Sequence, residues 1–356
     1  MLNISSIIFS LKQSTMKKLL LTSFAITLLA LGGFSQTHIA VQSNGEASFY
    51  SNFANALAAA TAGDTIYLPG GNFYIGTINI DKKLTIIGVG HYPEYTQASG
   101  ITQLDGTIRF VEGADHSQLQ GVYLTGNIIL GSGLANQVVN YLMVSRCNMS
   151  NIYLSYDGSA ANDAMHLYFS ENVIRSTVYG GYVQYVQFSK NIIGGGLRNL
   201  NSNAIVRNNI FLTTSSGYLA YLESVVFENN VFLSTANPIG FSTATCTFNN
   251  NIFVNNFSLP VGFSGSGNVV NKPFSQIFVN HTGGSFSYES DFQLAETSEG
   301  IGAGTDGNDI GIYGTSVPYK EGAVPFNPRI VSGQISPETD EDGNIQININ
   351  VEAQQR

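Results

Sequence analysis

The chain reads Phe188-Ser189-Lys190-Asn191-Ile192 near its middle, and this frame recurs about every 20 residues. An apolar residue is followed by two variable residues, an asparagine and a second apolar run. Five more copies of the frame begin at Leu124, Phe169, Val206, Phe227 and Phe248. A period of this length is typical of solenoids, in which each repeat adds one turn to a stacked coil. The frame therefore predicts a coil of about ten turns between residues 84 and 290.

The residues around each asparagine predict strands on both sides of it. Val225 and Phe227 alternate with polar residues, so one face of that strand should point inward. The frame from Leu222 to Phe232 also fits a leucine-rich repeat, which would need a helix after the asparagine. Other turns carry too little leucine, and a β-type run such as Ile210-Phe211-Leu212 follows instead. The repeat therefore favours an all-β coil.

The repeated asparagine has a mechanical explanation. Asparagine tolerates the left-handed backbone conformation that a sharp corner needs, and stacked amides can form a hydrogen-bonded ladder. We therefore expect the asparagines at the corner to lie in one file, namely Asn172, Asn191, Asn209, Asn230 and Asn251.

The residues before the repeat predict a lead-in strand at 36–48 and a helix from Ser51 to Ala62, with Ser51 as N-cap. Together with Gly63-Asp64-Thr65-Ile66-Tyr67-Leu68-Pro69-Gly70-Gly71 and Leu84-Thr85-Ile86-Ile87-Gly88, this helix resembles the amino-terminal cap of the pectin-lyase-like superfamily. The resemblance implies a right-handed parallel β-helix whose first turn is covered by a capping helix. Such a cover protects apolar interior and unpaired strand edges.

The end of the chain divides into two parts. Residues 291–314 resemble the carboxy-terminal ending of secreted bacterial β-helix repeat proteins, although Glu299 replaces the proline common in that family. The expected β-helix domain is therefore 36–314. Residues 315–356 form a proline-interrupted, acidic tail with a terminal strand. That strand could pack along the coil, or the tail could engage an export or surface partner.

The first 35 residues predict a signal peptide, with Met16 as an alternative true start. Its removal leaves 12 basic against 24 acidic residues, a net charge of −12. Such a balance disfavours nucleic acid and anionic membranes as partners. We expect a secreted, extracellular or cell-surface protein, with the periplasm as an alternative. No membrane span is expected after cleavage, and the chain is expected to be a monomer.

Two features of the repeat carry no chemistry in this interpretation. Cys147 and Cys246 fall five turns apart, too far for a disulfide, so both are expected to be free, buried thiols. Arg146, Glu171 and Lys190 follow the lead residue at the same offset in successive turns. They are expected to form solvated pairs between turns, and so are Arg207 and Glu228.

The acidic residues are too scattered for the best-known β-helix enzymes. Lyases need a carboxylate cluster for calcium, and hydrolases need two or three close carboxylates. From Ala164 to Ser290 the chain has no aspartate, and its four glutamates are spread over several turns. Asp306, Asn308 and Asp309 could offer oxygen ligands to calcium, but they lack the spacing of a known calcium loop. No cofactor is therefore expected.

The long turn between Val144 and Phe169 holds the weak candidates for a catalytic site: Asp157, Asp163, His166 and Arg175. Insertions in solenoids gather on one face and often carry binding. An exposed turn with a surface histidine is the favoured explanation of the same residues. Tyr179, Tyr182 and Tyr185 follow and could stack on sugar rings as alternate residues of one strand, or pack between turns.

The composition and the repeat favour a non-catalytic protein that binds a glycan or a protein along one face of the coil. The alternative is a divergent polysaccharide lyase or glycoside hydrolase that acts on acidic polysaccharide, with its site near Asp157, Asp163 and His166. Because this architecture carries many functions, the fold alone does not decide between them.

Overall fold

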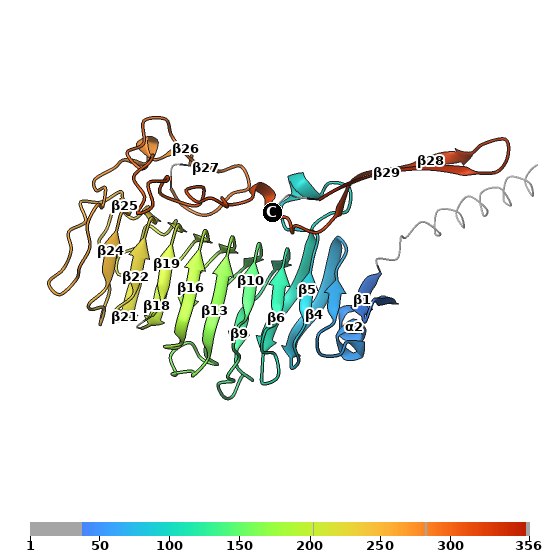
Figure 1. Cartoon of the computed structure of the whole chain (residues 1–356), viewed down its shortest axis with the longest axis horizontal. Coiled ribbons are helices and arrows are strands. Elements are labelled where there is room, and N and C mark those ends of the chain that lie inside the picture. Colours follow the sequence, from blue (N-terminus) through green and yellow to red (C-terminus); the bar gives the residue numbers. More distant parts are fainter. Residues whose placement is uncertain (1–37, 202, 282, 354–356) are drawn as a thin grey trace, which may run out of the picture. The chain divides into compact units, whose positions relative to one another are not determined.

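The computed structural model describes residues 38–201, 203–281 and 283–353. Within them the chain winds into a parallel β-coil whose successive strands stack side by side (Figure 1). The all-β class and the solenoid agree with the prediction from the repeat. The predicted signal peptide lies outside the described residues. In the ranges described, no helix is long and apolar enough to cross a membrane.

Sheet A forms one face of the coil and has 11 strands in the described chain. In spatial order they are β2 (Glu46–Tyr50), β1 (Ile39–Ser43), β3 (Thr65–Tyr67), β5 (Thr85–Ile87), β7 (Gln118–Gln120), β10 (Met143–Ser145), β13 (Met165–Ser170), β16 (Gln184–Ser189), β19 (Ile205–Arg207), β22 (Val226–Glu228) and β24 (Thr247–Asn249). From β3 onward neighbouring strands are parallel, one strand for each turn.

The other two faces belong to a 14-stranded sheet, joined at its start by the long strands β4 (Gly71–Ile80) and β6 (Thr102–Phe110). Ladder B continues with β8 (Tyr123–Leu124), β11 (Asn148–Met149), β14 (Val173–Ile174), β17 (Ile192–Ile193), β20 (Ile210–Phe211), β23 (Val231–Phe232) and β25 (Ile252–Phe253). Ladder C continues with β9 (Ile128–Leu130), β12 (Ile152–Tyr153), β15 (Val178–Tyr179), β18 (Leu197–Leu200) and β21 (Leu219–Leu222).

The core lies inside the coil and is built from equivalent residues of successive turns. The inward file on sheet A is Ile66, Ile86, Leu119, Val144, Phe169, Phe188, Val206, Phe227 and Phe248. Within it the rings of Phe227 and Phe248 stack with centroids 4.6 Å apart. This alternation confirms the predicted inward face of each strand, since side chains in a strand point to opposite sides in turn.

The N-terminal elements differ from their predicted bounds. The lead-in strand is a hairpin of β1 and β2, and the helix α2 is Phe53–Ala59. Asn52, not Ser51, is the N-cap, because its side chain accepts a hydrogen bond from the Asn55 N–H at 2.9 Å. The helix buries Phe53 and Ala56 in the coil's own core.

The asparagine file is confirmed, but its role at the corner is not the predicted one. The side chain of Asn191 accepts hydrogen bonds from Asn172 and donates one to Asn209 at 3.0 Å. The pattern continues through Asn230 and Asn251. The left-handed residue is the one before each asparagine, such as Glu171 or Lys190. The asparagine contributes the ladder, and its predecessor makes the corner.

Asn127 does not belong to this file. Leu124 pairs with Leu104 on ladder B, so the frame that it leads is out of register with the other five. Asn127 instead bonds to Asn151, which in turn accepts from the Thr177 N–H, at a second corner. In that turn the residue equivalent to Phe188 on sheet A is Leu119, which lies one strand before Leu124.

The two cysteines are free and buried, as predicted. They belong to turns five strands apart on sheet A. Burial raises the pKa of the Cys147 thiol to about 12 and that of Cys246 to about 11. Both thiols are therefore neutral members of the core.

The coil ends earlier than predicted. Isolated parallel bridges join Thr247 to Ser264 and Ile252 to Val269, and no later residue in the described chain extends the coil. The elements outside the coil are η1 (Pro93–Thr96), η2 (Phe274–Gln276), an antiparallel pair of β26 (Phe278–Asn280) and β27 (Asp291–Leu294), and η3 (Glu321–Ala323).

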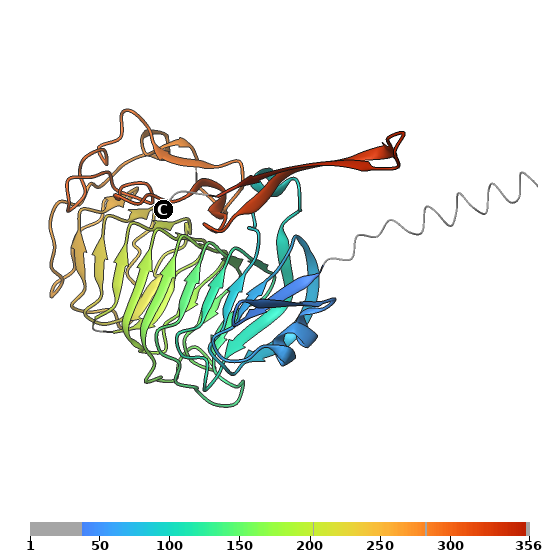
Figure 2. The same ribbon diagram turned by 45° about the vertical axis from the view of Figure 1, so that its right-hand side comes forward.

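The chain then turns back along the coil. In this returning segment, residues 303–326, successive residues contact earlier and earlier turns. Figure 2 shows this segment running back beside the coil. Ala303 contacts Asn250, whereas Val324 contacts Arg146. The chain ends in a hairpin of β28 (Arg329–Thr339) and β29 (Ile345–Glu352). The terminal strand therefore pairs with β28 and not with the coil.

Candidate functional site

A groove of about 530 Å³ lies between the outer face of sheet A and the returning segment. Its floor carries Met143, Tyr168, Ser170, Gln187, Ser189, Arg207 and Glu228. The returning segment supplies the wall, with Thr305, Asp306, Thr315, Ser316 and Val317. The groove therefore joins residues that lie far apart in the sequence.

The floor follows from the period of the coil. In each turn two left-handed residues enclose four strand residues that alternate inward and outward, as between His166 and Glu171. Each turn therefore presents two outward side chains, and parallel register aligns them in two files. One file is Gln118, Met143, Tyr168, Gln187, Ile205, Val226 and Thr247, and the other is Gln120, Ser145, Ser170, Ser189, Arg207, Glu228 and Asn249.

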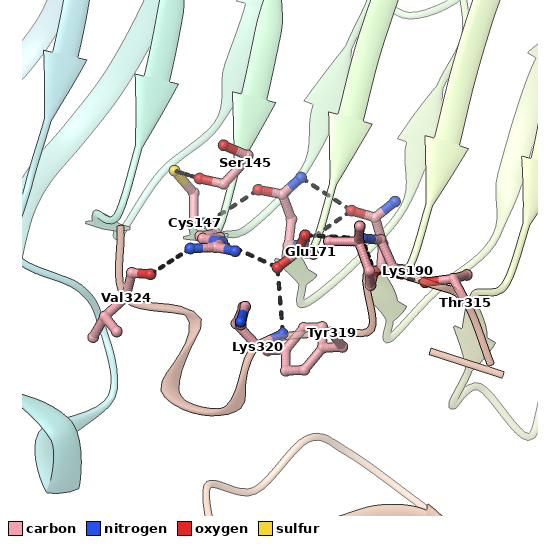
Figure 3. Close-up of polar contacts among 12 residues, drawn as sticks. Ser145, Cys147, Glu171, Lys190, Thr315, Tyr319, Lys320 and Val324 are labelled. Atoms are coloured by element: carbon pink, nitrogen blue, oxygen red, sulfur yellow. Dashed lines mark hydrogen bonds and ion pairs between the residues drawn. The ribbon is translucent and has the colours of Figure 1, made fainter. Parts of the chain in front are cut away.

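The wall is fixed to the coil by a buried group of charges (Figure 3). Glu171 accepts from Arg146 Nε at 3.0 Å and from Lys190 Nζ at 3.0 Å. Its carboxylate also accepts from the backbone N–H of Lys320 at 3.3 Å. The side chains of Arg146 and Glu171 are only 2% and 8% exposed. The prediction of solvated pairs is therefore wrong for this group, because the returning segment covers it.

The two cations of this group also bind the returning segment directly. Arg146 Nη1 donates to the Val324 carbonyl at 2.7 Å, and its guanidinium lies 3.7 Å from the ring centre of Phe326. Lys190 Nζ donates to the Val317 carbonyl at 2.8 Å. Backbone carbonyls thus supply the acceptors that two buried cations need.

Asparagine amides hold the other half of the wall. Asn229 and Thr305 exchange two hydrogen bonds, of 2.9 and 3.1 Å. Asn208 Nδ2 donates to the Gly311 carbonyl at 3.0 Å, and Asn250 Nδ2 donates to the Ala303 carbonyl at 2.7 Å. All three asparagines occupy the left-handed position of their turns. The wall is therefore attached at every turn from Asn250 back to Arg146.

The charged side chains of the groove balance one another. Two cations, Lys190 and Arg207, face two anions, Glu228 and Asp306. Lys190 is already engaged by Glu171. Hydrogen bonds from Asn308 lower the pKa of Asp306, and the nearby Arg207 charge lowers it further. The groove therefore has no excess of either sign.

The uncharged part of the groove offers both apolar and polar contacts. Tyr168 is 39% exposed and Met143 is 45% exposed on neighbouring strands. With its amide oriented to satisfy hydrogen bonding, Gln187 accepts from Arg207 Nη2 at 2.9 Å. Hydroxyl groups line both the floor and the wall. An aromatic face beside hydroxyl and amide groups suits a ligand with apolar and hydrogen-bonding faces.

The predicted candidates at the long turn lie outside this groove. Asp157 is exposed and accepts from the N–H groups of Ser159 and Ala160, each at 2.8 Å. These bonds lower its pKa and close the turn. Asp163 is exposed in the same loop. Arg175 lies beyond β14 and donates to the carbonyls of Leu124 and Thr125, so the structure places it at another corner.

His166 and Tyr185 belong to an exposed aromatic ridge at the edge of sheet A. The ridge consists of His116, Tyr141, His166 and Tyr185, all in the left-handed conformation. Neighbouring rings stack nearly parallel, with centroids 4.6, 4.9 and 5.0 Å apart. Because the inner ring faces cover one another, the ridge offers mainly ring edges to a ligand.

The three candidate tyrosines do not share one strand, contrary to the prediction. Tyr179 lies on β15 in ladder C and stacks on Tyr153 with centroids 4.8 Å apart. Tyr182 lies in the turn before β16, and its hydroxyl donates to Asn199 Oδ1 at 3.4 Å. Only Tyr185 lies on sheet A. Packing between turns accounts for the rings of Tyr179 and Tyr185.

The residues considered as possible calcium ligands, Asp306, Asn308 and Asp309, close their own loop. Asp306 accepts from the backbone and the side chain of Asn308, and Asp309 accepts from the Gly302 N–H at 2.8 Å. Among the residues described, no three His, Cys, Asp or Glu side chains gather closely enough to hold a metal ion.

Sequence reasoning named Arg207, Glu228 and Asp306 for other reasons but did not predict the groove. The floor could have been found, because Tyr168, Arg207 and Glu228 occupy outward positions set by the repeat. The wall could not, because no periodicity links the returning segment to the coil. Comparison with known families, curated proteins and solved structures finds no match to this chain.

Proposed function

We propose that this protein binds an uncharged glycan in the groove between sheet A and the returning segment. The observation that carries the proposal is an exposed aromatic ring, Tyr168, set among hydroxyl and amide groups in the groove. Sugar rings present apolar CH faces and polar edges, which such a surface matches. The files of outward residues run along the coil, so a linear chain of sugars would lie along its axis.

The charge balance of the groove selects against acidic glycans. Its two cations are offset by two anions, and Lys190 is held by a buried carboxylate. The chain as a whole carries a formal net charge of −9. The groove offers an acidic polysaccharide no net positive potential that would offset the free energy of desolvating its charges. A neutral polysaccharide has no charges to desolvate.

The test is a binding titration with neutral and acidic oligosaccharides of equal length. Tyr168→Ala should weaken binding of the neutral ligand about 5-fold, since a stacked ring contributes about 1 kcal/mol. Tyr74→Ala is the matched control, because Tyr74 is 84% exposed on β4 and lies outside the groove. Equal loss in both variants, or binding of acidic ligands alone, would exclude the proposal.

A second candidate is glycoside hydrolysis, which one observation favours. Glu228 on the floor and Asp306 on the wall place two carboxylates in the same groove. The lowered pKa of Asp306 suits a nucleophile or base and not a general acid, so Glu228 would have to donate the proton. Turnover of a neutral glycan that is lost in Glu228→Gln while binding persists would establish the enzyme.

Export to the outside of the cytoplasm fits this function and rests on the predicted signal peptide. Sequencing the N-terminus of the exported protein tests it, with Gln36 as the expected first residue. An N-terminus at Met1 or Met16 would contradict the prediction.

A further inference from the structure

The C-terminal hairpin has one face made mainly of aliphatic side chains, with Thr339 opposite Ile345 near the tip. This hairpin face consists of Ile330, Ile335, Ile345, Ile347, Ile349 and Val351, each between 47% and 66% exposed. Direct pairing of Ile335 with Ile347 and of Ile330 with Val351 puts them on the same side. The opposite side carries Gln334, Gln346, Asn348 and Asn350. The hairpin is therefore amphipathic, with its apolar side in solvent.

Such a hairpin is incomplete as it stands. The two strands form a sheet of their own, with no third strand beside them in the described chain (Figure 1). Two-stranded hairpins in water are marginally stable unless another layer covers their apolar face. Exposed aliphatic patches of this kind mark interaction sites. The face therefore requires an occupant.

We propose that the occupant is the hairpin face of a second copy of this chain, packed across a two-fold axis. A largely aliphatic face without charge is complementary to itself, as an isologous contact requires. The six side chains offer on the order of 500 Å² per copy, so pairing removes on the order of 1,000 Å², the lower bound for a stable interface. The protein is then a dimer, unlike the monomer expected from its sequence.

Charge fixes the relative direction of the two hairpins. The tip carries Glu338, Asp340, Glu341 and Asp342, whereas at the base Arg329 is paired with Glu352. A parallel arrangement would bring both acidic tips together, and like charges repel. In an antiparallel arrangement each tip lies beside the partner's base. The middle of the hairpin, at Ile349 opposite Gly333, then falls near the two-fold axis.

Sedimentation of the chain after removal of residues 1–35 tests the dimer. Ile347→Lys should raise the dimer dissociation constant about 100-fold, because it places a charge in the apolar contact. Asn348→Lys adds the same charge on the opposite face and should change it less than about 3-fold. A wild-type chain that stays monomeric at about 100 µM, or equal effects of both variants, would overturn the proposal.

Cysteine cross-linking tests the direction without relying on a destabilising charge. Both native thiols are buried, so an added cysteine is the reactive one. Ile349→Cys should form a disulfide with its own copy, whereas Ile345→Cys near the tip should not. Cross-linking of Ile345→Cys alone would show a parallel contact and contradict the inference. Binding of phosphatidylcholine vesicles by a monomeric chain would assign the face to lipid instead and equally refute the dimer.

Discussion

Two rows of side chains run next to each other where sheet A meets ladder B, and they follow opposite rules. The inner row repeats one residue: Asn172, Asn191, Asn209, Asn230, Asn251 and Asn268. The outer row, one residue earlier in each turn, varies: Arg146, Glu171, Lys190, Asn208, Asn229 and Asn250.

The difference lies in what each row contacts. An inner asparagine bonds to its own equivalents in the turns before and after, so one residue type satisfies every position. An outer residue bonds to the returning segment, whose sequence has no matching period. Each turn therefore carries a side chain fitted to a particular point of that segment. Repetition thus marks contacts within the coil, and variation marks contacts with something outside it.

Glu171→Gln should give the largest effect on the outer row. The variant leaves Arg146 and Lys190 buried without their shared carboxylate, which costs about 3–5 kcal/mol. The returning segment should detach from the coil before the coil unfolds. Protease cleavage between residues 315 and 326 should therefore accelerate, while the circular dichroism of the coil stays unchanged. Limited proteolysis followed by mass spectrometry measures this.

Glu228→Gln serves as the control for that experiment. Glu228 lies on the outer face of sheet A and contributes no ion pair to the buried group. Cleavage at an unchanged rate in Glu171→Gln would mean that the charges do not hold the segment.

Asn191→Asp should be the next largest effect and acts on the inner row. The change removes the amide that donates to Asn209 and to the Phe169 carbonyl, and it brings a carboxylate against acceptors. We expect a loss of about 3 kcal/mol in the free energy of unfolding at neutral pH. Urea denaturation measures it. Asn203→Asp, at an exposed left-handed position, should cost less than about 0.5 kcal/mol.

The two rows also explain how much the sequence could predict. The coil, the file of asparagines and the free cysteines follow from local periodicity, because their partners are neighbouring turns of the same kind. The left-handed corner was assigned one residue too late, since asparagine suits both roles and only the structure separates them. The buried charges and the groove wall depend on contacts more than 100 residues apart, such as Lys190 with Val317. No local pattern encodes them.

A third prediction uses pH to compare the uncharged contact between His91 and Tyr288 with the charged contacts of Glu171. His91 is fully buried and contacts the Tyr288 hydroxyl at 3.3 Å, so it joins the loop before β6 to residues beyond the coil. Burial lowers the pKa of His91 to about 3. The unfolded chain takes up a proton below pH 6.5, and the folded chain does not. Stability is therefore lost as pH falls from 6.5 toward 3.

The expected loss is about 2 kcal/mol at pH 5, above the range in which ordinary carboxylates titrate. His91→Phe should remove most of this dependence in urea denaturation between pH 6.5 and 5, and the rest belongs to His281, whose burial also lowers its pKa. Tyr288→Phe removes the hydrogen bond but leaves the imidazole buried, so it should keep the slope. An unaltered slope in His91→Phe would assign the acid sensitivity to another group.

The smallest predicted effect concerns Cys147, where the inner row begins. Its thiol takes the place of an amide: it contacts the Leu119 carbonyl at 3.7 Å, and its backbone N–H donates to Asn172 at 3.0 Å. Cys147→Asn would extend the row by one turn and should stabilise the protein by about 0.5–1 kcal/mol.

Cys246 is the matched control, because it faces the core at an inward position away from the row. Cys246→Asn buries an amide without those partners and should destabilise by about 1–3 kcal/mol. If Cys147→Asn raises the free energy of unfolding and Cys246→Asn lowers it, the row, and not asparagine itself, is the source of the stability. If both variants lower it, the asparagine ladder cannot be extended to the turn of Cys147.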